Sequence, residues 1–146
     1  MDSSPGTYII VMRSGQEASL QIRSWGRIEL RRGWYIYVGS AFGPGGIRAR
    51  VSRHFREDKA KHWHIDDITA LARPQSAWFS VESQRLEHTW ATVCQQSDEF
   101  TAVRGFGCSD CTCYSHLFFA GKEPSLGQFI DKTGSDVQIW RPERDV

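Results

Sequence analysis

Apolar residues in the first part of the chain gather in short segments that are typical of β-strands. Residues 6–12 (GTYIIVM) form a continuous apolar run, and residues 34–38 (WYIYV) combine aromatic with β-branched side chains. Between them, residues 19–23 and 27–30 alternate polar and apolar positions, which predicts a hairpin. This part of the chain therefore predicts an antiparallel sheet with two strongly apolar strands.

A helical period follows a glycine-rich segment. Residues 39–46 contain four glycines and a proline, a composition that predicts an irregular turn. Ile47, Val51 and Phe55 then lie at i, i+4 and i+8, so they form one apolar stripe. The pattern predicts a helix over residues 47–55.

Helices and short strands alternate in the rest of the chain. A second helix is predicted over residues 65–72, because Pro74 disfavours its continuation. Ser83 is a plausible N-cap for a third helix that ends near Cys94. The remaining predicted elements are strands over 76–81 and 116–120 and a helix over 124–132.

The order of these elements predicts an α/β fold with a small, mainly antiparallel central β-sheet flanked by α-helices. A chain of 146 residues has the usual size of one domain. We expect a single domain over residues 1–146, with a core over about residues 6–120 and a peripheral C-terminal segment over residues 121–146.

The overall composition says little about a binding partner, but the distribution of charged residues along the chain is informative. The net charge is only +1, yet six basic residues lie between residues 44 and 64. The N-terminus lacks the pattern of a signal peptide, and no segment has the length of a membrane span. We therefore expect a cytoplasmic protein that does not associate with a membrane and whose basic segment meets phosphate groups.

Five polar residues have the chemistry that metal-assisted phosphodiester cleavage needs. Two phenols and a guanidinium are joined by an imidazole and a carboxylate on a mainly apolar helix: Tyr8, Tyr37, Arg50, His54 and Glu87. A carboxylate holds a hard divalent cation through oxygen, and an arginine clamps the phosphate. A phenol or an imidazole accepts the proton of the attacking water.

Several sequence blocks resemble one family of nucleases. GTY at residues 6–8 and YVG at residues 37–39, followed by Arg50 and His54-Phe55, resemble the GIY-YIG nuclease superfamily. Three longer blocks are similar to its Uri-type endonuclease branch: YVGSAFGPGG (37–46), KHWHID (61–66) and GFGCSDCTCYSHLFF (105–119). With them, the resemblance extends over nearly the whole chain.

The resemblance implies an endonuclease that hydrolyses DNA phosphodiester bonds around one Mg²⁺ or Mn²⁺. Tyr8, Tyr37, Arg50 and His54 correspond to the catalytic positions, and Glu87 corresponds to the metal-binding glutamate. Glu82 competes with Glu87 for that role, although it precedes the predicted cap. Substrate contacts are expected from six further residues: Gly39, Ser40, Arg48, Arg53, His62 and His64.

Several alternatives stay open from the sequence alone. Tyr8, Tyr37 or His54 can serve as the base, and the sequence contains no asparagine to match the family's late one. A non-catalytic nucleic-acid-binding module on the same fold is therefore an alternative function. Single- and double-stranded DNA both remain open as substrates, as do roles in repair, recombination, restriction and RNA processing.

A cysteine cluster offers a third interpretation. Cys108, Cys111, Cys113 and His116 lie within nine residues, which suggests a zinc or thiol sensor. The single residue between Cys111 and Cys113 is tight for a closed tetrahedral site, so a compact loop is the other interpretation. His62 and His64 likewise suit either a metal site or a structural and substrate-contact role.

Overall fold

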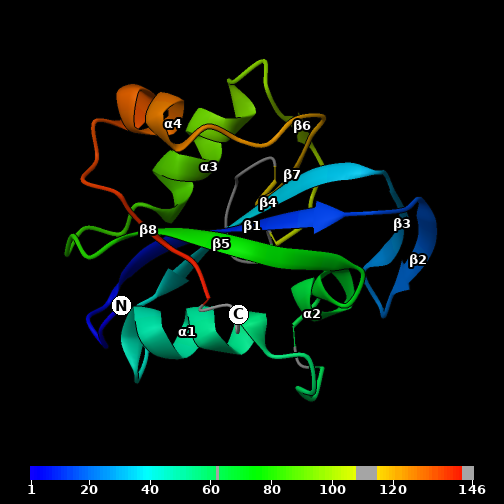
Figure 1. The fold of residues 1–146 in the computed structure, drawn as a ribbon, viewed down its shortest axis with the longest axis horizontal. Coiled ribbons are helices and arrows are strands. Elements are labelled where there is room, and N and C mark those ends of the chain that lie inside the picture. The colour runs from blue at the N-terminus through cyan, green and yellow to red at the C-terminus, as the bar shows by residue number, and fades with distance from the viewer. Residues whose placement is uncertain (62, 108–114, 143–146) are drawn as a thin grey trace.

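The computed structural model describes residues 1–61, 63–107 and 115–142, and its elements follow one another as Figure 1 shows. Among the described helices, none combines the length and the apolar character that a membrane span requires. The strands are β1 (Gly6–Ser14), β2 (Ala18–Ile22), β3 (Gly26–Leu30), β4 (Gly33–Ala41), β5 (Ala72–Ser80), β6 (Thr101–Ala102), β7 (Leu117–Ala120) and β8 (Gln138–Trp140). The helices are α1 (Gly46–Phe55), α2 (Ile65–Thr69), α3 (Glu87–Gln95) and α4 (Leu126–Thr133).

Six of the described strands form one sheet in the order β6-β7-β4-β1-β5-β8, and every pairing in it is antiparallel. β1 lies at its centre, between β4 and β5. β2 and β3 form a separate two-stranded ribbon, as the alternating pattern predicted. The predicted α/β fold with a mainly antiparallel sheet and flanking helices is confirmed.

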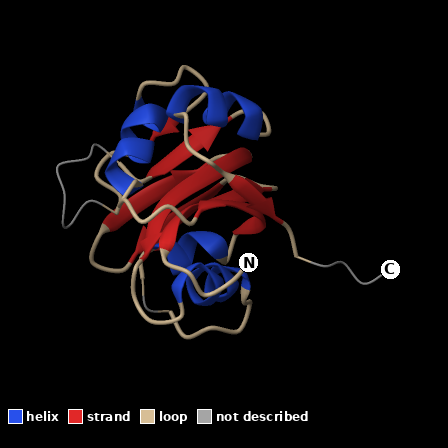
Figure 2. Ribbon diagram, turned by 90° about the vertical axis from the view of Figure 1, so that its left-hand side faces the viewer, coloured by secondary structure: helices blue, strands red, loops and turns tan. Residues whose placement is uncertain are grey.

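Helices cover both faces of the sheet (Figure 2), and the alternation of side chains along β1 supplies a core to each face. Tyr8, Ile10 and Met12 point to the face that α1 and α2 cover. Ile9 and Val11 point to the opposite face, where α3 and α4 contribute Trp90, Cys94 and Phe129. The continuous apolar run in β1 is therefore explained by burial on both sides.

Two predicted boundaries are wrong because strand pairing outweighs local propensity. β4 continues through the glycine-rich segment to Ala41, since Gly39 and Ala41 pair with Tyr8 and Gly6 of β1. Pro74 does not end a helix but lies within β5, next to a shift in the β1–β5 register. Such an irregularity accommodates a residue that cannot donate a ladder hydrogen bond.

The C-terminal half departs from prediction at three places. α3 begins at Glu87, and its N-cap Leu86 lies three residues after the predicted cap at Ser83. β6 and β8 have only two and three residues, too few to give a period in the sequence. Within the segment 121–146, which we expected to be peripheral, Phe129 is buried in the core and β8 pairs with β5.

Candidate active site

The register of β1 and β4 brings both candidate tyrosines to the face that α1 covers. Tyr8 lies directly opposite Gly39, and Tyr37 lies two residues earlier on β4. A Cβ atom at Gly39 would lie 2.5 Å from both Cζ and Oη of Tyr8. The glycine is therefore required here, because the Tyr8 ring lies across the backbone of β4.

α1 carries the cationic part of the site, and the N-terminal segment fixes where this helix begins. Gly46 has a φ of 59°, and a Cβ there would collide with the carbonyl oxygens of Ser3 and Ser4. The amide of Ile47 donates to the Ser4 carbonyl at 2.9 Å. With this start, Arg50 and His54 occupy the same side of α1, one turn apart, as their spacing predicted.

Tyr8 and His54 form a buried hydrogen bond between β1 and α1. The Tyr8 hydroxyl lies 2.7 Å from Nε2 of His54, and both side chains are almost fully buried. Nδ1 of His54 has no hydrogen-bond partner among the residues that the structure describes. Both side chains are therefore almost inaccessible to bulk water, although they line the cavity described below.

Burial controls the protonation of this pair. Desolvation and, after it, the positive charge of Lys59 lower the pKa of His54 from 6.5 to about 3. Burial and the neighbouring Tyr37 raise the pKa of Tyr8 well above 10, although the Arg50 guanidinium opposes this rise. At neutral pH the site therefore holds a neutral imidazole beside a neutral phenol.

Arg50 is half-buried and lies between an aromatic ring and the tyrosine. Its Cζ atom is 4.7 Å from the centre of the Trp63 ring, a cation–π geometry. The Arg50 guanidinium also acts on Tyr8, whose pKa it lowers against the effect of burial. These contacts restrict the guanidinium to the side of α1 that faces the sheet.

Glu87 approaches the sheet at a gap in its edge. β7 pairs with β4 only from Trp34 to Tyr37, so Gly39 and Ser40 lie beyond the end of β7. Burial would raise the pKa of Glu87, but hydrogen bonds from His116 and Ser40 outweigh it and lower this pKa. Glu87 is therefore an ionised carboxylate at neutral pH, with a quarter of its side chain exposed.

One cavity of about 260 Å³ joins these groups. Most of the residues proposed from the sequence line it, although they come from separate elements: Tyr8, Tyr37, Gly39, Ser40, Arg50, His54, His64 and Glu87. Arginine, phenol, imidazole and carboxylate groups thus face one space that admits a phosphate group and water. Glu82 is exposed and does not line this cavity.

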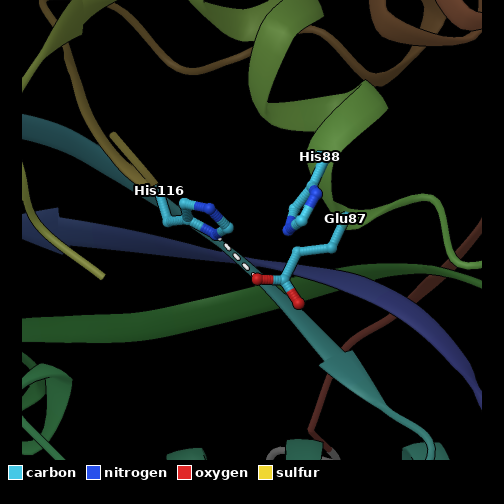
Figure 3. A group of neighbouring side chains, drawn as sticks. All are labelled: Glu87, His88 and His116. Atoms are coloured by element: carbon cyan, nitrogen blue, oxygen red, sulfur yellow. Dashed lines mark ion pairs between the residues drawn. The ribbon is translucent and has the colours of Figure 1, made fainter. Parts of the chain in front are cut away.

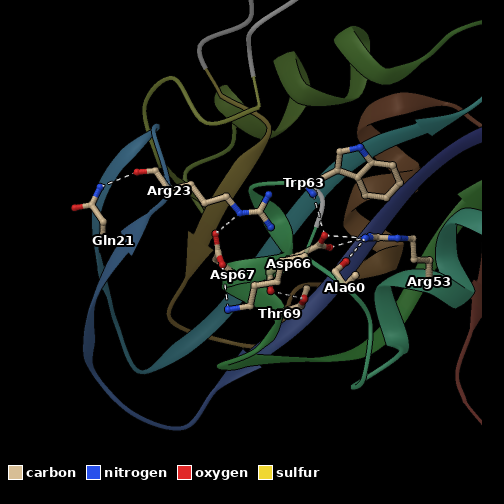
Figure 4. Close-up of polar contacts among 9 residues, drawn as sticks. Gln21, Arg23, Arg53, Ala60, Trp63, Asp66, Asp67 and Thr69 are labelled. Atoms are coloured by element: carbon tan, nitrogen blue, oxygen red, sulfur yellow. Dashed lines mark hydrogen bonds and ion pairs between the residues drawn. The ribbon is translucent and has the colours of Figure 1, made fainter.

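Two predicted substrate contacts lie elsewhere, and one lies outside the described residues. Arg48 is exposed on α1. Arg53 forms a bidentate ion pair with the buried carboxylate of Asp66, with both N–O distances 2.9 Å (Figure 4). Its guanidinium thus anchors α2 to α1 and does not line the cavity. His62 lies outside the described residues.

Sequence reasoning missed several residues of the site. Trp63, Phe106 and Gly107 line the cavity, and His116 pairs with Glu87. The sequence suggested His116 only as a partner of Cys108, Cys111 and Cys113, which lie outside the described residues. The block that holds Phe106 and His116 was the available signal, because it belongs to the blocks that resemble the nuclease branch.

His116 and Glu87 are joined by His88 in a group that can hold a metal ion (Figure 3). One ligand atom from each of the three side chains lies within 4.8 Å of the other two. The ionised carboxylate of Glu87 gives this group the negative charge that a divalent cation requires. The residues present therefore fit a metal ion at the rim of the cavity.

Comparisons with known proteins identify a family but no relative of established activity. No curated protein and no solved structure matches the chain. One family model, described as "Domain of unknown function DUF123", matches residues 7–139, a span that runs from the second residue of β1 to the second residue of β8 and contains every residue of the candidate site. The chain therefore belongs to the DUF123 family.

Proposed function

We propose that this protein is a divalent-metal-dependent endonuclease that hydrolyses DNA phosphodiester bonds, of the GIY-YIG type and similar to its Uri-type branch. One observation carries the proposal. The residues that the resemblance implies for catalysis line a single cavity: Tyr8, Tyr37, Arg50, His54 and Glu87. Strand register, helix period and a sheet-edge gap each contribute to this convergence, so it does not follow from any one local pattern.

Arg50 and Glu87 bind the charged parts of the reaction in this proposal. The Arg50 guanidinium donates hydrogen bonds to the phosphate oxygens and compensates their growing charge. Glu87 provides oxygen ligands for the divalent cation, and the bound cation supplies charge stabilisation and a water of lowered pKa. Arg48 and the other exposed basic residues of this region attract the nucleic-acid backbone.

Tyr8 and His54 provide a route for the proton of the attacking water. The water oxygen forms a bond to phosphorus, the bond to the leaving oxygen breaks, and the Tyr8 oxygen accepts the water proton. Tyr8 passes its own proton to Nε2 of His54, 2.7 Å away, and because the low pKa of His54 lets it hold this proton only transiently, the proton returns through Tyr8 to the leaving oxygen. This route requires the His54 tautomer that carries its proton on Nδ1. Tyr37 is the competing acceptor, because it is half-exposed and lines the same cavity.

Cleavage assays with single-stranded, double-stranded, flapped and branched DNA in the presence of Mn²⁺ or Mg²⁺ test the proposal. We expect metal-dependent cleavage that falls by at least about 100-fold in Glu87→Gln and in Arg50→Ala. Glu82→Gln and Arg32→Ala are matched controls, because both residues are exposed and lie outside the cavity. If Glu87→Gln and Arg50→Ala cut as well as the parent, the assigned site is wrong.

The same assay separates the alternative function and the two phenols. DNA binding that weakens with salt, with no cleavage by the parent, would identify a non-catalytic binding module. If Tyr8 transfers the proton, Tyr8→Phe abolishes cleavage and Tyr37→Phe retains part of it. The opposite ranking would assign the proton transfer to Tyr37.

A further inference from the structure

Glu87 is one member of a group of three side chains, and the other two are histidines. Glu87 and His88 are the first residues of α3, and His116 directly precedes β7. Figure 3 shows the three side chains turned toward one another. Among the residues that the structure describes, they are the one His/Cys/Asp/Glu group with metal-ligand spacing.

His116 is fixed in place by the sheet. Its amide donates to the Phe106 carbonyl at 2.8 Å, and its carbonyl accepts from the Val38 amide at 2.9 Å. Its side chain is 1% exposed, and Nδ1 lies 3.2 Å from the Val38 carbonyl oxygen and 2.9 Å from Oε2 of Glu87. A ligand held this rigidly imposes its geometry on any ion that binds beside Glu87.

The spacing suits a shared ion. Two ligands bound at about 2.1 Å and about 90° apart are separated by about 3.0 Å. The 2.9 Å between Nδ1 of His116 and Oε2 of Glu87 is close to this separation, and an ion bound between them replaces the proton of Nδ1, which is released to solvent. His88 is exposed, and its ring centre lies 6.0 Å from that of His116. A ligand atom of His88 nevertheless lies within 4.8 Å of those of Glu87 and His116.

The types of ligand decide which ion the group prefers. Imidazole nitrogens suit Zn²⁺ and similar transition-metal ions, and Mn²⁺ binds such a site more weakly than Zn²⁺, whereas Mg²⁺ prefers oxygen ligands and retains its waters. We propose that Glu87, His88 and His116 together bind one divalent transition-metal ion in preference to Mg²⁺. The inference rests on the proposed function in taking the Glu87 carboxylate as the metal ligand, and it adds two ligands and a class of ion.

The position of this group is consistent with a metal ion that takes part in the proposed reaction. Glu87 lines the cavity that contains Tyr8 and Arg50, so an ion held by the group borders the space proposed for the phosphate. Three protein ligands leave coordination positions for water and for a phosphate oxygen. The ion pair between Glu87 and His116 does not by itself explain why His88 lies beside them, whereas a shared metal ion does.

The test uses the full chain, freed of metal by chelation and then titrated with Mn²⁺. Electron paramagnetic resonance counts the bound ion, and electron spin-echo modulation detects directly coordinated ¹⁴N. We expect one bound Mn²⁺ with coupling to two imidazole nitrogens. Zn²⁺ displaces it, as the affinity order of these ions requires, while Mg²⁺ at about 100-fold excess does not.

Two variants assign the nitrogens. His88→Ala and His116→Ala each remove one coupling and weaken Mn²⁺ binding by at least about tenfold. His116 is buried, so its variant is accepted only if circular dichroism matches the parent, and the exposed His88 supports the test by itself. His64→Ala and Glu82→Gln are the controls, and we expect both to retain the two couplings.

Bound Mn²⁺ without nitrogen coupling would overturn the inference, as would Mn²⁺ that Mg²⁺ displaces at equal concentration. Absence of bound Mn²⁺ and Zn²⁺ would overturn it as well. Nitrogen-coordinated Mn²⁺ in a protein that cuts no nucleic acid would uphold the metal site and reject the endonuclease. Cleavage supported by an ion without nitrogen ligands would reject the histidines and retain the proposed function.

Discussion

The Tyr8 hydroxyl lies 2.7 Å from Nε2 of His54, which joins the central strand to α1 inside the protein. The contact connects two sequence motifs that are 46 residues apart. Because His54 is buried and its pKa is lowered to about 3, the imidazole is neutral wherever the protein is folded near neutral pH. The bond between these two neutral groups therefore has both a structural and a chemical consequence.

The structural consequence is a dependence of stability on pH. An unfolded chain binds a proton at His54 near pH 6.5, whereas the folded protein binds it only near pH 3. The unfolded state therefore holds more protons in this window, so the stabilisation is complete above pH 6.5 and declines as the pH falls. We expect about 2 kcal/mol of this contribution to be lost between pH 7 and pH 5.

Urea unfolding of the parent and of His54→Gln across this range measures the contribution. The variant lacks the imidazole, so its free energy of unfolding should change less between pH 7 and pH 5 than that of the parent. All other titrating groups are common to both proteins and cancel in the difference. Equal pH dependence in the two proteins would show that His54 has the same pKa in the folded and the unfolded state, which contradicts the prediction.

Gly39 provides a steric test of the Tyr8 position. In Gly39→Ala the new Cβ would lie 2.5 Å from Cζ and Oη of Tyr8, so the ring must move. We expect the free energy of unfolding to fall by about 1–3 kcal/mol. On the proposed function, cleavage should fall by about 100-fold, because the Tyr8 oxygen would be displaced from the reacting atoms.

Gly121→Ala is the matched control for this change. No atom of the described residues lies within 4 Å of the position that a Cβ would take at Gly121, so the same added methyl group meets open space. We expect its cleavage rate and stability to stay close to those of the parent. A Gly39→Ala protein with unchanged cleavage would place the reaction away from Tyr8.

Arg53 and Arg48 lie on the same helix but should differ in what they affect. The Arg53 guanidinium compensates the fully buried carboxylate of Asp66. Arg53→Ala leaves that carboxylate without its cation, and we expect the free energy of unfolding to fall by about 3 kcal/mol. Denaturant unfolding monitored by tryptophan fluorescence measures this loss.

Arg48→Ala supplies the comparison, because this side chain is exposed. Its stability should change by less than about 0.5 kcal/mol. On the proposed function, its affinity for DNA should fall, with a slightly smaller dependence on salt. If Arg53→Ala is fully stable and instead weakens DNA binding, Arg53 contacts the substrate as the sequence suggested.

The sequence predicted β1, most of β4 and α1 because the two strands are dense apolar runs and the helix has a regular apolar stripe. The sequence could identify several site residues because they belong to motifs that resemble a known family or to a predicted helix: Tyr8, Tyr37, Arg50 and Glu87. The prediction that Pro74 limits a helix was wrong, because the pairing of β5 with β1 tolerates a proline at an irregular position. Such tertiary compensation has no signal in the local sequence.

The polar partners of the site were harder to predict than its principal residues. His116 meets Glu87 only because β7 ends at the level of Tyr37 and leaves the edge of β4 open. Asp66 forms an ion pair with Arg53 because α2 packs beside α1. The spacing of Arg53 within its own helix does not indicate this pair. Contacts of this kind depend on where separate elements stop, which is the least predictable feature of a sequence.

Trp63 is the residue whose contribution depends most directly on a contact that the sequence did not suggest. Its ring centre lies 4.7 Å from Cζ of Arg50 and 4.2 Å from Cζ of Arg53.

A cation–π contact contributes about 0.5–2 kcal/mol. Trp63→Leu removes the aromatic face and lets the Arg50 guanidinium move, so on the proposed function we expect kcat for cleavage to fall by about tenfold. Trp63→Phe retains an aromatic face and should recover part of this loss. Trp140→Leu controls for lost packing, because Trp140 makes an edge-to-face contact with Phe55 and does not line the cavity. Loss of stability in Trp63→Leu with an unchanged kcat would mean that Trp63 supports the fold without positioning Arg50.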